Sequence, residues 1–131
     1  MSVLLIADII DGELNLDQTA KALTAAKQLG KVSILCASYN CSDAANELAT
    51  LQDVEKVIVS DSELFKNSLA EPLSELISNL GKDFKYVIAA ATALGKNVMP
   101  RAAALLDVMV ISDVSKIISS DTFERPIYAG N

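Results

Sequence analysis

The sequence has no histidine and no tryptophan, and it contains only two cysteines, three tyrosines and three phenylalanines. Without histidine the chain cannot form the Ser-His or Cys-His pair that activates the nucleophile in many hydrolases. Its two thiols, Cys36 and Cys41, are not spaced as C-x-x-C and have no histidine to share a zinc ion. We therefore predict two free thiols in a reducing compartment, no metal site and no hydrolase centre.

Clusters of positive charge are also missing. The chain has eleven Lys and Arg residues and seventeen Asp and Glu residues, which gives a formal net charge of −6. The basic residues are spread along the chain, so we expect no binding of nucleic acid or of an anionic membrane. No apolar segment approaches the ~20 residues that cross a bilayer. The first strand is expected at Val3, which leaves no room for a targeting segment. We expect a cytoplasmic protein, or a mitochondrial matrix protein if a transit peptide has been removed.

Apolar residues are plentiful although aromatic ones are scarce. They make up 51% of the chain, and the mean hydropathy is +0.34. The core must therefore be aliphatic. A positive mean hydropathy in a small protein also suggests that something outside this chain covers part of its apolar surface.

Apolar runs alternate with amphipathic segments along the chain. We predict strands at Val3–Asp8, Val32–Ala37, Val54–Ser60, Tyr86–Ala91 and Val108–Ile111. The third contains charges near its start and is expected nearer an edge of the sheet. The alternation predicts one α/β domain over residues 1–131, with a Rossmann-like open, mostly parallel sheet and helices on both faces. The expected strand order is 3-2-1-4-5.

Capping residues mark the expected helix ends. Asn15 with Gln18 forms a capping-box pattern, and Gly30 would stop that helix. Ser42 would cap the second helix. Pro72 suits the first turn of a third helix, which Gly81 would end.

The stretch from Tyr86 is predicted to form the central βαβ unit. Tyr86–Ala91 is predicted to be a buried strand, and Thr92–Asn97 a turn that contains Gly95. Pro100 is expected in the first turn of the following helix. Val108–Ile111 would then return as a parallel strand beside the first, with a right-handed connection.

Ligands of such sheets bind beyond the carboxyl ends of the strands, which places any chemistry at the Thr92–Arg101 loop. The candidate anion-binding residues there are Thr92, Gly95, Lys96 and Arg101. The loop is not a Walker A motif, because the first glycine is missing and Asn97 replaces the hydroxyl residue. An ordinary turn into a helix is the alternative interpretation.

Three carboxylates lie at or beside expected strand ends, namely Asp8, Asp107 and Asp113. They could meet in space and hold a metal ion, but carboxylates at such positions usually bind turns or helix caps. No G-x-G-x-x-G follows the first strand, which argues against a dinucleotide dehydrogenase. We therefore predict no catalytic residues.

The pattern changes after Asp113. Val114–Ser119 and Phe123–Ala129 are expected to be strands joined by a turn at Ser120-Asp121. The second of them would end in mid-pattern and leave a sheet edge without a partner. We therefore expect that the chain is cut short.

Four stretches then identify a family resemblance. They read VLLIAD from Val3, ALTAAKQLG from Ala22, ALGKNVMPRAAALLDVMVISDV from Ala93 and DTFERPIYAGN from Asp121. Together they resemble the N-terminal domain of the electron-transfer flavoprotein alpha subunit over essentially the whole chain. This resemblance implies a fold of the adenine-nucleotide-hydrolase-like superfamily.

The resemblance also implies a function. Members of this family are αβ heterodimers that carry one FAD and pass electrons from dehydrogenases to a membrane quinone reductase or a related acceptor. FAD is held mainly by a C-terminal domain of the alpha subunit, which would begin after Asn131, and the beta subunit holds an AMP. This portion is then expected to pair with the beta subunit as a scaffold, to bind no cofactor itself and to be no enzyme. The alternative is a small nucleotide-binding module that works alone.

Overall fold

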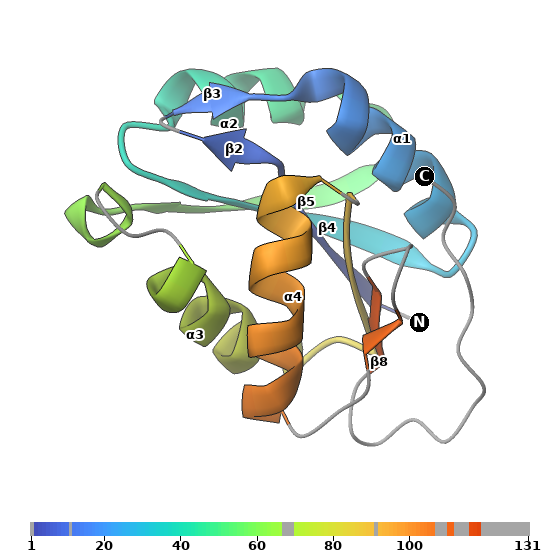
Figure 1. Ribbon diagram of the computed structural model, residues 1–131. Helices are drawn as coiled ribbons and strands as arrows, with labels where there is room; N and C mark the ends of the chain where they lie inside the picture. The colour runs from blue at the N-terminus through green and yellow to red at the C-terminus, as the bar shows by residue number, and fades with distance from the viewer. Residues whose placement is uncertain are drawn as a thin grey trace.

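A computed structural model shows the arrangement of the chain (Figure 1) and describes residues 2–10, 12–66, 70–90, 92–106, 110–111 and 116–118. The longer strands are β1 (Ser2–Ile6), β4 (Lys31–Ser38), β5 (Val54–Asp61) and β6 (Tyr86–Ala89). The shorter ones are β2 (Ile9–Ile10), β3 (Glu13–Leu14), β7 (Val110–Ile111) and β8 (Lys116–Ile118). The helices are α1 (Leu16–Lys27), α2 (Ser42–Ala49), α3 (Ala70–Gly81) and α4 (Ala93–Leu106), with a 3-10 turn, η1 (Glu63–Phe65).

The main sheet has the strand order β5-β4-β1-β6-β8-β7. Its first four strands are parallel, whereas β8 runs antiparallel to both β6 and β7. The predicted α/β class, the order of the first four strands and the edge position of the third are confirmed. The expected direct pairing of the fourth and fifth strands is wrong. β8 lies between them, because strands close in sequence favour antiparallel pairing.

Each central strand contributes side chains to two separate hydrophobic cores, one on each face of the sheet. Val3 and Leu5 of β1 pack on the side covered by α1 and α2, whereas Leu4 and Ile6 pack on the side covered by α3 and α4 (Figure 1). This follows from the period of two along a strand, which sends successive side chains to opposite faces. The strands β1, β4 and β6 are therefore buried on both faces, and their carboxyl ends lead into loops.

The first helix begins as the sequence predicts. The Asn15 side chain accepts a hydrogen bond from the backbone N–H of Gln18. In a capping box the Gln18 side chain would accept a hydrogen bond from the backbone N–H of Asn15. Here that N–H donates to the carbonyl of Asp8 instead, at 2.8 Å. The helix ends at Lys27 with Gln28 as its cap, so Gly30 is not the stop residue.

The start of the second helix differs from the prediction. Ser42 is its first residue and Cys41 its cap, without a side-chain hydrogen bond. The carboxylate of Asp61 instead accepts from the backbone N–H groups of Asn40 and Cys41, at 2.8 and 3.1 Å. A residue of the neighbouring strand thus orders this helix start, which a local capping rule does not anticipate.

The largest correction concerns α4. This helix already begins at Ala93, so the expected turn at Thr92–Asn97 is mostly helical and Pro100 lies inside the helix. Four of its side chains are buried against the sheet and α3, namely Val98, Met99, Ala102 and Ala103. Their helical spacing outweighs the breaking tendency of glycine and proline.

The third helix and the segments after Asp113 can also be compared with their predictions. The Pro72 helix ends at Gly81 as predicted, although it already begins at Ala70. The strand expected within Val114–Ser119 is confirmed as β8. The turn at Ser120-Asp121 and the strand at Phe123–Ala129 lie outside the described residues.

Candidate functional site

The candidate site lies where the carboxyl ends of β1 and β6 meet. These strands are neighbours, but the chain leaves β1 towards α1 on one face and leaves β6 directly into α4 on the other. Such a reversal is where α/β sheets usually bind ligands. Asp8 follows β1, and Thr92 precedes α4.

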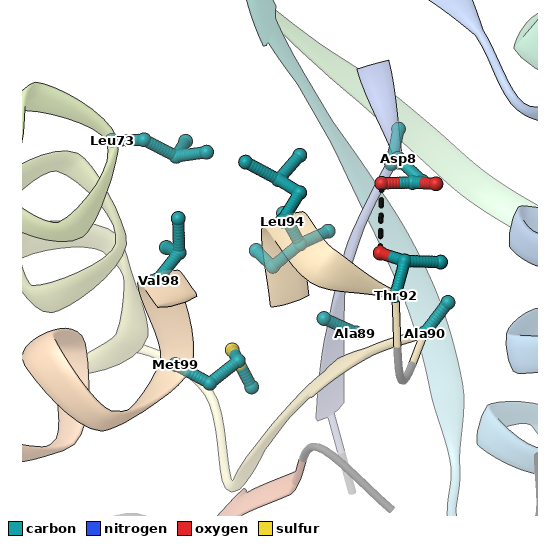
Figure 2. A pocket seen from close by; sticks show the side chains of 10 residues that line it. Asp8, Leu73, Ala89, Ala90, Thr92, Leu94, Val98 and Met99 are labelled. Carbon is teal, nitrogen blue, oxygen red and sulfur yellow. Dashed lines mark hydrogen bonds between the residues drawn. The ribbon is translucent and has the colours of Figure 1, made fainter. Parts of the chain in front are cut away.

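Hydrogen bonds hold Asp8 from three sides. Its backbone N–H donates to the hydroxyl of Thr19 at 3.1 Å, and its carbonyl accepts from Asn15. Its carboxylate accepts from the hydroxyl of Thr92 at 3.0 Å (Figure 2). The residue is 6% exposed. Asp8 is therefore a rigidly positioned, nearly buried carboxylate at the switch point of the sheet.

Apolar side chains fill the space behind this carboxylate. Figure 2 shows Leu94, Val98 and Met99 of α4 beside Leu73 of α3. The cavity among them is about 10 Å³ in volume, which is near the minimum for a single water molecule. A nucleotide or a flavin does not fit there.

The structure separates the residues of the predicted anion site. Gly95 and Lys96 lie in the first turn of α4, directly after Thr92. Arg101 lies farther along the same helix, about 12 Å from its start at 1.5 Å per residue. It lines a hollow between α3 and α4 with Glu71, Ser74 and Glu75. The expected loop is therefore a helix in which Arg101 is remote from Thr92.

Metal-binding groups are not assembled in the described part of the chain. No group of three or more His, Cys, Asp or Glu side chains there could hold a metal ion. Asp107 and Asp113 lie outside the described residues, so only Asp8 of the three predicted carboxylates has a described position. The described helices also include none long and apolar enough to span a membrane.

The two cysteines are free and buried. The Cys36 thiol lies 3.8 Å from the carbonyl oxygen of Cys41, and the Cys41 thiol 3.9 Å from that of Cys36. Burial, together with the neighbouring Cys41 and Asp61, raises the pKa of Cys36 to about 12. The thiolate form that attacks substrates or binds metals is therefore disfavoured at neutral pH.

This raised pKa predicts a stability loss in alkali. An unfolded cysteine ionises near pH 8.5–9, whereas Cys36 stays protonated in the folded chain until about pH 12. Between these values the unfolded state binds fewer protons, so stability falls as the pH rises. From pH 8 to pH 10 we expect Cys36 to contribute a loss of about 1.5 kcal/mol. Urea unfolding should show this loss in the parent chain but not in Cys36→Ala; equal pH slopes would contradict it.

Thr19 is a site residue that the sequence analysis missed. It is fully buried on α1 and holds the backbone of Asp8. A signal was present, because Thr19 falls on the same helical face as Ala22, Leu23 and Ala26, all of which are buried. A hydroxyl on an apolar face indicates a buried hydrogen-bond partner.

Comparison with known proteins gives the family. Residues 3–131 match the electron transfer flavoprotein domain. The chain is 53% identical over 131 residues to an electron transfer flavoprotein subunit alpha of Paracoccus denitrificans, covering 100% of this chain and 42% of that protein. It is 42% identical over 132 residues to the subunit alpha of Pseudomonas aeruginosa, with coverages of 100% and 42%.

A mitochondrial subunit alpha of Arabidopsis thaliana is 41% identical over 139 residues, which cover 100% of this chain and 38% of the plant protein. The chain thus spans about two fifths of the length of these relatives. These matches confirm the resemblance that the sequence stretches indicate: the chain belongs to the electron transfer flavoprotein family.

Proposed function

We propose that this chain is the N-terminal part of an electron-transfer flavoprotein alpha subunit and acts as the scaffold that pairs with the beta subunit. The observation that carries the proposal is the alignment of the whole chain with 42% of the Paracoccus denitrificans subunit alpha. The complete protein would pass electrons from dehydrogenases to a quinone reductase or a similar acceptor. It is a carrier rather than an enzyme, in the bacterial cytoplasm or the mitochondrial matrix.

In this proposal the remaining part of the subunit holds the FAD. Two features of the described residues support this division. The cavity at the switch point is filled by Leu94, Val98 and Met99. The open hollow beside it is lined by Asp8 and Glu13, whose negative charges would repel the diphosphate of FAD.

A nucleotide-binding module that works alone has less support. It would require Thr92 and Arg101 to act together on one phosphate, and Arg101 lies about 12 Å along α4 from Ala93, the residue after Thr92. The start of α4 alone offers only a weak anion site. Titration with AMP tests this alternative directly, and micromolar affinity would favour it.

Pairing with a beta subunit is the expected result of a mixing experiment. The purified chain and a beta subunit of the family should elute from size exclusion as one complex, because the chain supplies the alpha half of the interface. An acidic protein of similar size serves as the control partner. Separate peaks at concentrations well above micromolar would argue strongly against the scaffold role.

Visible absorption then locates the flavin. With added FAD, the chain alone should stay colourless after gel filtration. Flavin absorption bands that co-elute with the chain alone would place the cofactor in this part of the protein and contradict the proposed division.

A further inference from the structure

The carboxylate of Asp8 is buried, and no ion pair joins it to a Lys or Arg side chain whose position the structure describes. Thr92 supplies the one hydrogen bond that the described residues donate to the Asp8 side chain. The one ion pair found among them joins Lys27 and Asp53 elsewhere. Aspartates are rarely this buried unless a cation or several donors compensate the charge, since an ionised carboxylate can accept about four hydrogen bonds.

An open hollow on the surface has Asp8 among its lining residues. Its volume is about 550 Å³, and it is lined by Asp8, Ile10, Glu13, Leu14 and Asn15; we call it the β1 hollow. In Figure 2 one oxygen of Asp8 is hydrogen-bonded to Thr92, and the second has no hydrogen bond to the side chains drawn.

The chemistry of the β1 hollow selects positive charge. The described residues of its lining include two carboxylates, Asp8 and Glu13, and no Lys or Arg. The start of α1 adds about half a positive charge nearby. That contribution is smaller than two full negative charges, and Asp17 in the first turn of α1 offsets it further.

The apolar walls specify the shape of the ligand. Ile10 is 53% exposed, and the half-buried Leu14 also lines the hollow. An alkyl chain that ends in a charged nitrogen would bury its methylene groups against these two side chains and its head against Asp8. The side chains of lysine and arginine have this form, and so do free alkylamines and alkylguanidines.

We propose that the β1 hollow binds an alkylguanidinium or alkylammonium group, with the second carboxylate oxygen of Asp8 as the acceptor. A guanidinium N–H donates to that oxygen and completes the hydrogen bonding of the buried charge. The source is either a free small molecule or a basic side chain of a protein partner.

The test uses n-butylguanidinium as the probe and amide NMR spectra of the chain as the readout. The expected result is a saturable shift of the amide signals of Asp8, Ile10 and Thr92. The Asp8→Asn variant keeps an oxygen that can accept from Thr92 but loses the charge, and it should weaken probe binding at least ~10-fold. Asp53→Asn makes the same charge change at the other end of the sheet and should bind as the parent does.

Two controls keep the proposal falsifiable. Glu13→Gln at the exposed rim leaves the fold intact and should weaken binding about threefold through the lost charge. n-Butyltrimethylammonium carries the charge but no N–H donor and should bind clearly more weakly. Absence of shifts near Asp8, equal shifts with the trimethylated probe, or equal binding by Asp8→Asn would each overturn the proposal.

A last experiment distinguishes a free small molecule from a basic side chain of a protein partner. Only this experiment rests on the proposed function. If adding a beta subunit abolishes probe binding, a basic side chain of that partner occupies the hollow. If the probe still binds to the complex, the site takes a free small molecule. Because the probe is first tested on the chain alone, failure of the pairing and failure of the site are observed separately.

Discussion

Replacing Leu5 by alanine is expected to lower the free energy of unfolding by about 2–5 kcal/mol. Leu5 is fully buried in the central strand β1, with Ile34 of β4 and Ile88 of β6 as its neighbours in register. The truncation leaves a cavity between the sheet and the helices α1 and α2. Because β1 is paired with a strand on each side, it cannot move to close this cavity. Domains of this size are typically stable by only about 5–15 kcal/mol, so the loss is a large fraction of the total.

Urea unfolding followed by circular dichroism measures this effect. The matched control is Leu64→Ala, the same substitution at a side chain that is 73% exposed in η1. Its expected change is within about 0.5 kcal/mol. A Leu5→Ala loss below about 1 kcal/mol would mean that the two-sided core is less tightly packed than described.

Replacing Pro100 by alanine is expected to stabilise the chain by about 2 kcal/mol. Pro100 is exposed and is the eighth of the 14 residues of α4. Proline has no N–H to donate to the carbonyl of Lys96, and its ring crowds that carbonyl. Alanine restores the hydrogen bond and is about 3 kcal/mol more favourable inside a helix, before a smaller loss from a less restricted unfolded chain.

The control for this second variant is Arg101→Ala. Arg101 is the next residue of α4 and is also exposed. Its replacement changes no backbone hydrogen bond, so the unfolding midpoint should hardly move. A midpoint that falls in Pro100→Ala would show that the proline ring is needed for the packing of α4 on α3, where the Ser74 hydroxyl donates to the Val98 carbonyl at 3.3 Å.

Pro100 also shows where sequence reasoning failed. Gly95 and Pro100 are local signals, and they moved the expected helix start several residues too late. Helix formation was decided instead by the burial of Val98, Met99 and Ala102 against the sheet. Such burial depends on where α3 and β6 lie, so no local rule contains it.

The other predictions also depend on whether a feature is set by local or by long-range contacts. The four parallel strands and the Asn15 cap depend on residues close in sequence, and they were predictable. The Asp61 cap of α2 spans 20 residues and the Thr92–Asp8 bond spans 84. The position of β8 beside β6 likewise follows from long-range pairing. The predicted loop and the Asp8–Thr92 hydrogen bond lie at the same edge of the sheet, but no local pattern indicates that these two residues meet, because 84 residues separate them.

The central place of β1 has a consequence for the newly made chain. Val3 pairs with Val32 on one side and with Tyr86 on the other. At a synthesis rate of about 5–20 residues per second, the second partner emerges roughly 4–16 s after β1 itself. During these seconds one edge of an aliphatic strand has no partner. The nascent chain is therefore expected to need chaperones while it is on the ribosome, and slower translation would lengthen the period in which it can aggregate.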